Sequence, residues 1–119
     1  MRNNNILLID NNINYLHLLS IFLESKGFNV TVTQNGIKAF EILENNGFSI
    51  VITCFNMPCM NDMKLAINMR EQYPDIQVII ITNDLSPDLV GMAANAGITC
   101  ILSRSLNITK LLSIIRTSL

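Results

Sequence analysis

Charged side chains are scarce in this chain, and their scarcity limits what the protein can bind. Only 14% of the 119 residues are charged, whereas about a quarter are charged in a typical globular protein. The net charge is −1, while proteins that bind nucleic acid non-specifically carry a basic excess. We therefore expect no nucleic-acid binding by this chain and a surface rich in neutral polar groups.

Long apolar runs are also missing, and so is any framework of cysteines. No run approaches the roughly 20 apolar residues that a membrane-spanning helix needs, so we expect no membrane contact. The start of the chain, MRNNNILLID, lacks the apolar segment and cleavage site of a secretion signal. Three cysteines without metal-ligand spacing predict neither paired disulfides nor a metal site. A reducing, cytoplasmic location follows as an expectation.

A glycine-rich loop that could cradle phosphate is absent as well. Nucleotide and flavin pockets need such a loop directly after a strand. The loop after the first apolar run reads DNNINY, without glycine, and no Walker or dinucleotide fingerprint occurs elsewhere. The sequence therefore predicts no cofactor.

Short β-branched runs do alternate with longer segments of helical periodicity. Several of the short runs are apolar at nearly every position, which is typical of strands buried on both faces of a parallel sheet. The predicted strands are 5–9, 28–33, 49–53, 77–82 and 99–102. The predicted helices are 12–25, 36–46, 62–71, 86–97 and 107–118.

This alternation predicts an α/β fold with a doubly wound, five-stranded parallel sheet in a single domain, residues 1–119. Such sheets place their working site beyond the carboxyl ends of the strands. The residues to examine are therefore those that follow each predicted strand. They include Asp10, Asn11, Cys54, Asn56, Thr82 and Arg104.

The ordered set of strand-end motifs resembles a response-regulator receiver domain of the CheY-like type. The motifs that carry the resemblance are ILLIDNN, FNMPCM, IIITN, AANAGI and ILSRS, spread over essentially the whole chain. The resemblance implies a flavodoxin-like (βα)5 fold with strand order 2-1-3-4-5. It also implies a role in bacterial two-component or phosphorelay signal transduction.

The resemblance also implies a reaction, in which a carboxylate accepts a phosphoryl group from a histidine. By the motif, Cys54 stands at the acceptor position, and Asp10 and Asn11 stand where two acids hold Mg²⁺. Thr82 and Arg104 take the places of a hydroxyl and a lysine that contact the phosphoryl oxygens. At a further position, that of Asn56, the family uses a backbone carbonyl to help hold the metal.

The substitutions in this set predict that the chemistry is lost. A thiol cannot form an acyl phosphate, and its soft sulfur is a poor ligand for Mg²⁺, which prefers carboxylate oxygens. Asp10 is the only acid left in the set. We therefore expect a vestigial site without metal, and an atypical, non-phosphorylatable receiver domain that is not an enzyme and acts as a protein-interaction module.

Cys54 leaves an alternative open, which is a redox or other thiol-based switch on a receiver scaffold. A nearby cation lowers the pKa of a thiol and makes it reactive, and Arg104 is the candidate cation. The charge of Asp10 would offset this effect. The simpler interpretation is that Cys54 fills the space of a lost carboxylate.

Protein partners are expected on two surfaces that the resemblance implies. On the first predicted helix, we assign Leu18, Leu19, Phe22 and Leu23 to the core. We therefore place Ile13, Leu16 and Ile21 on the outer side as a docking patch. The expected partner is a histidine kinase, a phosphotransfer domain or another response regulator. The face made by the fourth helix, the fifth strand and the fifth helix is a candidate homodimer surface.

Overall fold

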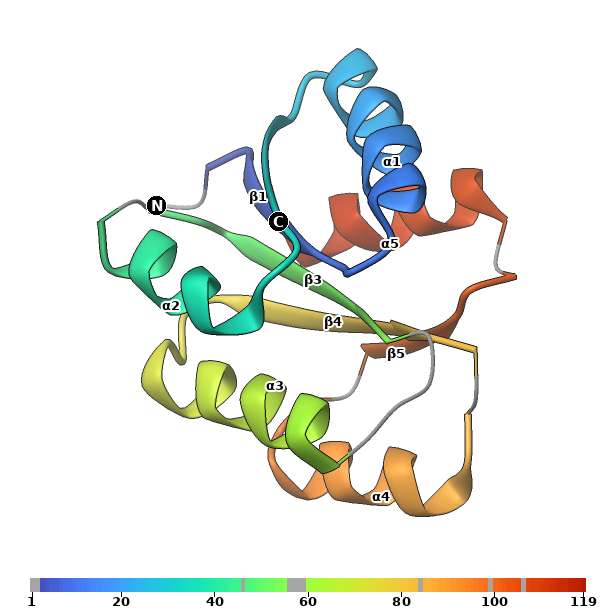
Figure 1. Cartoon of the computed structure of the whole chain (residues 1–119). Helices are drawn as coiled ribbons and strands as arrows, with labels where there is room; N and C mark the ends of the chain where they lie inside the picture. Colours follow the sequence, from blue (N-terminus) through green and yellow to red (C-terminus); the bar gives the residue numbers. More distant parts are fainter. Residues whose placement is uncertain (1–2, 46, 56–59, 84, 99, 106) are drawn as a thin grey trace.

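Five parallel strands form one sheet at the centre of the molecule (Figure 1). The computed structural model describes residues 3–45, 47–55, 60–83, 85–98, 100–105 and 107–119. The strand order is β2-β1-β3-β4-β5, and every neighbouring pair is parallel. The strands are β1 (Asn5–Ile9), β2 (Asn29–Thr33), β3 (Ile50–Phe55), β4 (Gln77–Thr82) and β5 (Cys100–Ser103).

One helix follows each strand, and the helices cover both faces of the sheet. Helices α1 and α5 pack on one face, and α2, α3 and α4 pack on the other (Figure 1). Their bounds are α1 (Ile13–Ser25), α2 (Gly36–Asn45), α3 (Met60–Gln72), α4 (Pro87–Asn95) and α5 (Ile108–Ser118). The predicted fold class and strand order are confirmed.

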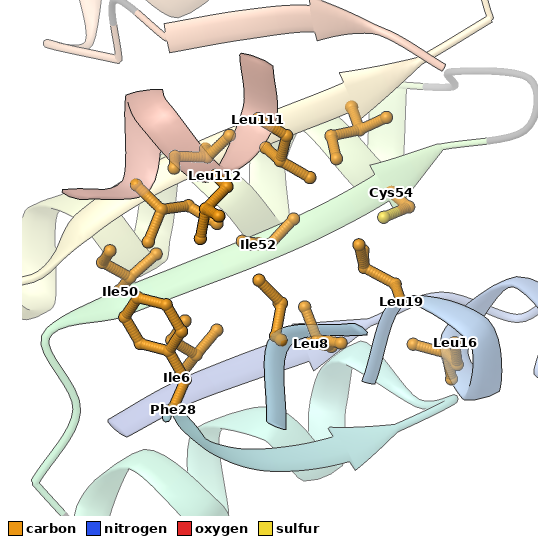
Figure 2. Packing of buried hydrophobic residues seen from close by; sticks show 14 residues of the cluster. Ile6, Leu8, Leu16, Leu19, Phe28, Ile50, Ile52, Cys54, Leu111 and Leu112 are labelled. Atoms are coloured by element: carbon orange, nitrogen blue, oxygen red, sulfur yellow. The ribbon is translucent and has the colours of Figure 1, made fainter. Parts of the chain in front are cut away.

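The strands supply the core on both faces because successive side chains of a strand point in opposite directions. Ile6 and Leu8 of β1 lie in the cluster beneath α1 and α5. Leu7 and Ile9 lie in the cluster on the other face, beneath α2, α3 and α4. Figure 2 shows the first cluster, in which Cys54 lies near the carboxyl end of β3.

Short polar side chains begin three of the helices, and their oxygen atoms accept hydrogen bonds from backbone N–H groups of the first turn. The side chain of Asn12 accepts a hydrogen bond from the Tyr15 N–H at 3.1 Å, which fixes the start of α1. Ser86 and Asn107 cap α4 and α5 in the same way. These caps set how each helix leaves the strand-end loops that contain the site.

The predicted orientation of α1 is wrong by part of a turn. Leu16, assigned to the outer patch, is buried with 2% of its surface exposed (Figure 2), whereas Leu18, assigned to the core, is 68% exposed. Adjacent helical residues are about 100° apart, so Leu18 and Leu19 cannot both lie at the centre of the inward stripe. The buried stripe is Leu16, Leu19 and Leu23.

Within the described residues, no helix has the length and apolar character needed to cross a membrane.

Candidate functional site

The carboxyl ends of four neighbouring strands bring the predicted site residues together. Asp10 follows β1, whose last residue Ile9 pairs with Thr53, the residue before Cys54. Thr82 ends β4 beside β5. The backbone N–H of Arg104 donates to the Thr82 carbonyl at 2.9 Å, which continues the β4–β5 pairing by one residue.

A buried ion pair at this site joins the residue after β1 to the residue after β5. The Arg104 Nη1 atom lies 3.0 Å from the Asp10 Oδ2 atom. The Asp10 side chain is fully buried, and only 13% of the Arg104 side chain is exposed. The other carboxylate oxygen, Oδ1, accepts a hydrogen bond from the Asn12 N–H at 3.1 Å. Both oxygens of Asp10 are therefore engaged by the protein itself.

Tyr15 holds the Arg104 side chain in place from the first turn of α1. The guanidinium carbon lies 4.2 Å from the centroid of the Tyr15 ring, close enough for a cation–π contact. Burial is the main cause that raises the pKa of the Tyr15 hydroxyl, and the Arg104 charge acts against it. Stacking and ion pairing together turn the guanidinium toward β1. The remaining Arg104 nitrogens, Nε and Nη2, are buried and have no hydrogen-bond partner within the described residues.

The Cys54 thiol is shielded from solvent and is held in its protonated form. Only 6% of the Cys54 surface is exposed, and the residue belongs to the core cluster beneath α1 and α5. Burial, followed by the charge of Asp10, raises the pKa of this thiol to about 12, although the Arg104 charge lowers it. The expected effect of Arg104 is present, but desolvation outweighs it. At neutral pH the reactive thiolate is therefore scarce.

The remaining predicted site residues are Thr82, Asn11 and Asn56. Thr82 is fully buried. Asn11 is exposed, and its backbone carbonyl accepts a hydrogen bond from the Gln34 side chain at 3.2 Å. Asn56 lies outside the described residues.

The donor set does not fit Mg²⁺, the ion that the resemblance implies. Mg²⁺ requires oxygen ligands in near-octahedral geometry, usually from one or two carboxylates. Among the residues described at the strand ends, the one carboxylate is Asp10, which Arg104 neutralises, and the thiol of Cys54 offers sulfur instead of oxygen. In the described part of the chain, no group of three metal-ligating side chains comes together.

Sequence reasoning did not assign Tyr15 to the site or the Asp10–Arg104 contact. The first turn of α1 places Tyr15 three residues after the Asn12 cap, beside the strand end that carries Asp10. The sequence indicated these contacts only through the presence of an aromatic residue, Tyr15, early in α1 and of an arginine, Arg104, after β5. The Arg104–Ser105 peptide bond is trans, the form that a non-proline residue strongly prefers.

Of the residues predicted to bind a partner, two are on the surface and one is not. Ile13 and Ile21 are 62% and 55% exposed, and Leu18 joins them on the outer side of α1. Leu16 does not belong to this surface. On the face suggested for a homodimer, Val90 of α4 and Ile108 of α5 are also exposed.

Comparison with known proteins agrees with this architecture. The response regulator receiver domain family matches residues 6–116. The response regulator receiver protein CpdR of Brucella abortus is 34% identical over 87 residues, which are 70% of this chain and 72% of CpdR. The chemotaxis protein CheY-3 of Vibrio cholerae is 30% identical over 100 residues, which are 82% of this chain and 77% of CheY-3.

A solved structure extends the likeness to the fold as a whole. The signal receiver domain of an HD domain-containing protein from Pseudomonas fluorescens Pf-5 superposes with a TM-score of 0.88. Its sequence is 25% identical, and the match covers 98% of this chain and 94% of that one. The chain belongs to the response regulator receiver domain family, whose members work in two-component signalling.

Proposed function

We propose that this chain is an atypical receiver domain that does not accept phosphate and that acts as a protein-interaction module. The observation that carries the proposal is the ion pair between Asp10 and Arg104. The guanidinium neutralises Asp10, the one carboxylate at the carboxyl ends of the strands within the described residues. With Cys54 at the acceptor position, no carboxylate is available there to form an acyl phosphate.

The free-energy cost of separating Asp10 from Arg104 favours a site in which these two side chains stay paired. Breaking a buried pair by moving one partner away leaves an uncompensated charge, which costs about 3–5 kcal/mol. The Tyr15 ring adds a further contact that Arg104 would lose. A receiver that switches must rearrange these strand-end groups when phosphate arrives. Here the fixed pair supports constitutive binding of a partner.

The outer side of α1 is the surface we assign to that partner. Ile13, Leu18 and Ile21 are exposed there in a chain that has few charges to keep such a surface solvated. Apolar side chains gathered on one helix indicate an interaction surface better than isolated ones do. The partner class we propose is a histidine kinase, a phosphotransfer domain or another response regulator.

The thiol switch at Cys54 is the weaker of the two functional hypotheses. A redox-sensing cysteine is usually exposed and has a lowered pKa. Cys54 has the opposite properties, since it is buried and its pKa is raised to about 12. Filling the space of a lost carboxylate accounts for these properties without a switch.

The two hypotheses rank the same variants in opposite order. The wild-type chain and its variants are used to capture partners from the native cell, and the captured protein is then bound to each variant in purified form. We expect Ile21→Asp to weaken binding at least about tenfold, because a charge in a desolvated apolar contact costs several kcal/mol. Cys54→Ala should bind within about threefold of wild type, with and without peroxide.

The matched control is Ile37→Asp, which places the same charge on α2, away from α1. Ile37 is 73% exposed. It should bind like wild type. If Cys54→Ala abolishes a peroxide response while Ile21→Asp binds normally, the thiol switch replaces the interaction module. If acetyl phosphate changes the affinity of wild type, the proposed indifference to phosphate is wrong.

A further inference from the structure

The edge strand β2 has backbone groups that no second strand satisfies. Within the described residues, β2 pairs with β1 alone, because it stands at one end of the strand order. The Asn29 N–H donates to the Asn4 carbonyl at 2.9 Å, so the backbone groups of Asn29 face β1. In a parallel pair, successive residues direct these groups to opposite sides, so those of Val30 and Val32 point away from β1. The outer edge of β2 can therefore pair with one more strand.

This edge lacks the features that usually protect an exposed strand from pairing. Natural edge strands carry charged residues, proline or a bulge that blocks a second strand. Residues 27–37, GFNVTVTQNGI, contain no charged residue and no proline. The pairing of β2 with β1 is continuous from Asn29 to Thr33, so β2 has no bulge there. Nothing in the sequence of β2 therefore opposes a further strand.

The side chains along this edge are accessible as well. Val32 is 47% exposed although it is apolar, and Asn29 and Thr31 are also exposed. Val32 lines a groove of about 260 Å³ between α1 and β2, to which Ile13 and His17 contribute from α1. A strand that pairs with β2 would cover the exposed part of Val32 and so add apolar burial to its backbone hydrogen bonds.

Symmetry and charge favour a second copy of this chain as the source of that strand. A two-fold interface brings the same surface of both copies together, so charges close to its axis meet like charges. The uncharged segment 27–37 avoids this repulsion.

The hydrogen-bonding pattern of β2 also suits pairing with itself. With the two-fold axis at Thr31, the centre of the strand, antiparallel pairing places Val30 opposite Val32 of the second copy. Both residues direct their backbone N–H and C=O groups outward, which is what a hydrogen-bonded antiparallel pair requires. Thr31 then lies opposite Thr31 of the second copy, and threonines in this position stabilise a sheet.

We propose that this chain forms a two-fold symmetric dimer in which the β2 strands of two copies pair antiparallel and join the two sheets into one. The pairing satisfies the open edge of both copies at once. It uses a surface different from the α4, β5 and α5 face that the resemblance suggests for a homodimer. The inference goes beyond the proposed function, because it depends neither on phosphate acceptance nor on the partner that binds α1.

Sedimentation equilibrium of the whole chain tests whether β2 holds a dimer together. We expect wild type to show a reversible monomer–dimer equilibrium at concentrations up to about 1 mM. Val32→Lys should weaken the dimer at least about tenfold, because a lysine on an edge strand opposes pairing. The matched control is Val90→Lys on α4, the same substitution at a valine that is 40% exposed. It should dimerise within about threefold of wild type.

Cysteine cross-linking tests the position of the two-fold axis. In Thr31→Cys the two Cα atoms would lie about 4.5 Å apart across the axis, which is within the range for a disulfide. We expect mild oxidation to link two copies of this variant. Asn29→Cys is the matched control, because its two copies would lie about 13 Å apart along the strands and cannot be bridged. Oxidised wild type shows what the native cysteines contribute.

Four results would overturn the proposal. They are a wild-type chain that stays monomeric, equal dimerisation of wild type and a folded Val32→Lys variant, a dimer that Val90→Lys dissociates, or cross-linking of Thr31→Cys that is no faster than that of Asn29→Cys. If the chain is monomeric and the Val30 and Val32 amides become protected from hydrogen exchange when a captured partner is added, a strand of that partner pairs there instead. None of these results bears on acetyl phosphate or on Ile21→Asp, so the proposed function is tested separately.

Discussion

The two ends of the parallel sheet are held together by different chemistry. At the amino end, neutral side chains connect the strands, and the hydrogen bonds of Asn5 are exposed. The Asn5 side chain donates to the Gly47 carbonyl at 2.8 Å and accepts from the Asn29 side chain at 3.2 Å. At the carboxyl end, one buried ion pair connects β1 to the segment after β5.

The difference shows where this domain can tolerate change. Exposed neutral hydrogen bonds exchange readily with water, so each contributes little and none enforces a single arrangement. A buried ion pair cannot exchange with water, and its loss leaves a charge in the core. At the carboxyl end, where receivers carry their chemistry, Asp10 and Arg104 are therefore the positions that we expect to tolerate change least.

Removing the arginine should give the largest effect. We expect Arg104→Met to lower the free energy of unfolding by about 3–5 kcal/mol, because Asp10 is left buried and unpaired. The double variant Asp10→Asn/Arg104→Met should regain at least half of this loss, since no charge remains. Urea denaturation at neutral pH measures both values.

The control is Arg116→Met, at an exposed arginine of α5, which should change stability by no more than about 0.5 kcal/mol. A loss below about 1 kcal/mol in Arg104→Met would mean that the two ends of the sheet do not differ as described.

The amino end has one demanding position of its own, the turn from α1 into β2. Gly27 adopts a φ of +95°, and a Cβ there would meet no atom within 4 Å. Any cost of Gly27→Ala therefore comes from the backbone, and we expect a loss of about 1–3 kcal/mol.

Gly91 in α4 has equally open surroundings but no positive φ. Gly91→Ala should therefore stabilise the protein by about 0.5–1 kcal/mol. Thermal melts of the two variants side by side measure the difference. If both alanines change stability in the same direction, backbone conformation is not what limits Gly27.

Alkaline pH should weaken the carboxyl end through Cys54. The pKa of the buried thiol is about 12, and its ordinary value is 9.0, so between these values the unfolded chain binds fewer protons than the folded one. Stability then falls as pH rises through this window. Relative to Cys54→Ala, wild type should lose about 1 kcal/mol between pH 9 and pH 10.

The comparison with Cys54→Ala cancels the titration of lysine and tyrosine side chains that both proteins share. A constant difference in unfolding free energy across this range would show that Cys54 is more hydrated than its burial indicates.

The smallest effect is expected from the exposed hydrogen bonds at the amino end. Asn5→Ala removes a donor to Gly47 and an acceptor for Asn29, both in contact with solvent. We expect a loss of about 0.5–1 kcal/mol by urea denaturation, because water replaces both partners. A loss as large as that of Arg104→Met would remove the distinction between the two ends.

The sequence pattern was sufficient to predict the parallel sheet, and the resemblance added its strand order. Strands such as Gln77–Thr82 are apolar throughout, and caps such as Ser86 mark the helix starts, so local patterns and the resemblance gave the fold. The orientation of α1 was not predicted correctly, because Leu16, Leu18 and Leu19 are equally apolar. Only packing against the sheet decides which of them is buried.

It was predictable which residues follow the strands and meet at the carboxyl end of the sheet, but the way they interact was not. Asp10, Cys54 and Arg104 were identified from their places after the strands. The direction of the Arg104 side chain depends on its contacts with the Tyr15 ring and with Asp10. Asp10 lies 94 residues before Arg104 in the sequence. A contact of this range has no local signal in a single sequence.

We propose that the carboxyl end of the sheet holds an ion pair in place of phosphoryl chemistry. Intact-mass measurement after incubation with acetyl phosphate and Mg²⁺ tests it most directly, alongside a receiver domain that carries an aspartate at the acceptor position. We predict that this chain stays at its unmodified mass while the reference domain gains a phosphoryl group. A persistent phosphoryl adduct on this chain, mapped to any residue at the carboxyl ends of the strands, would contradict the account.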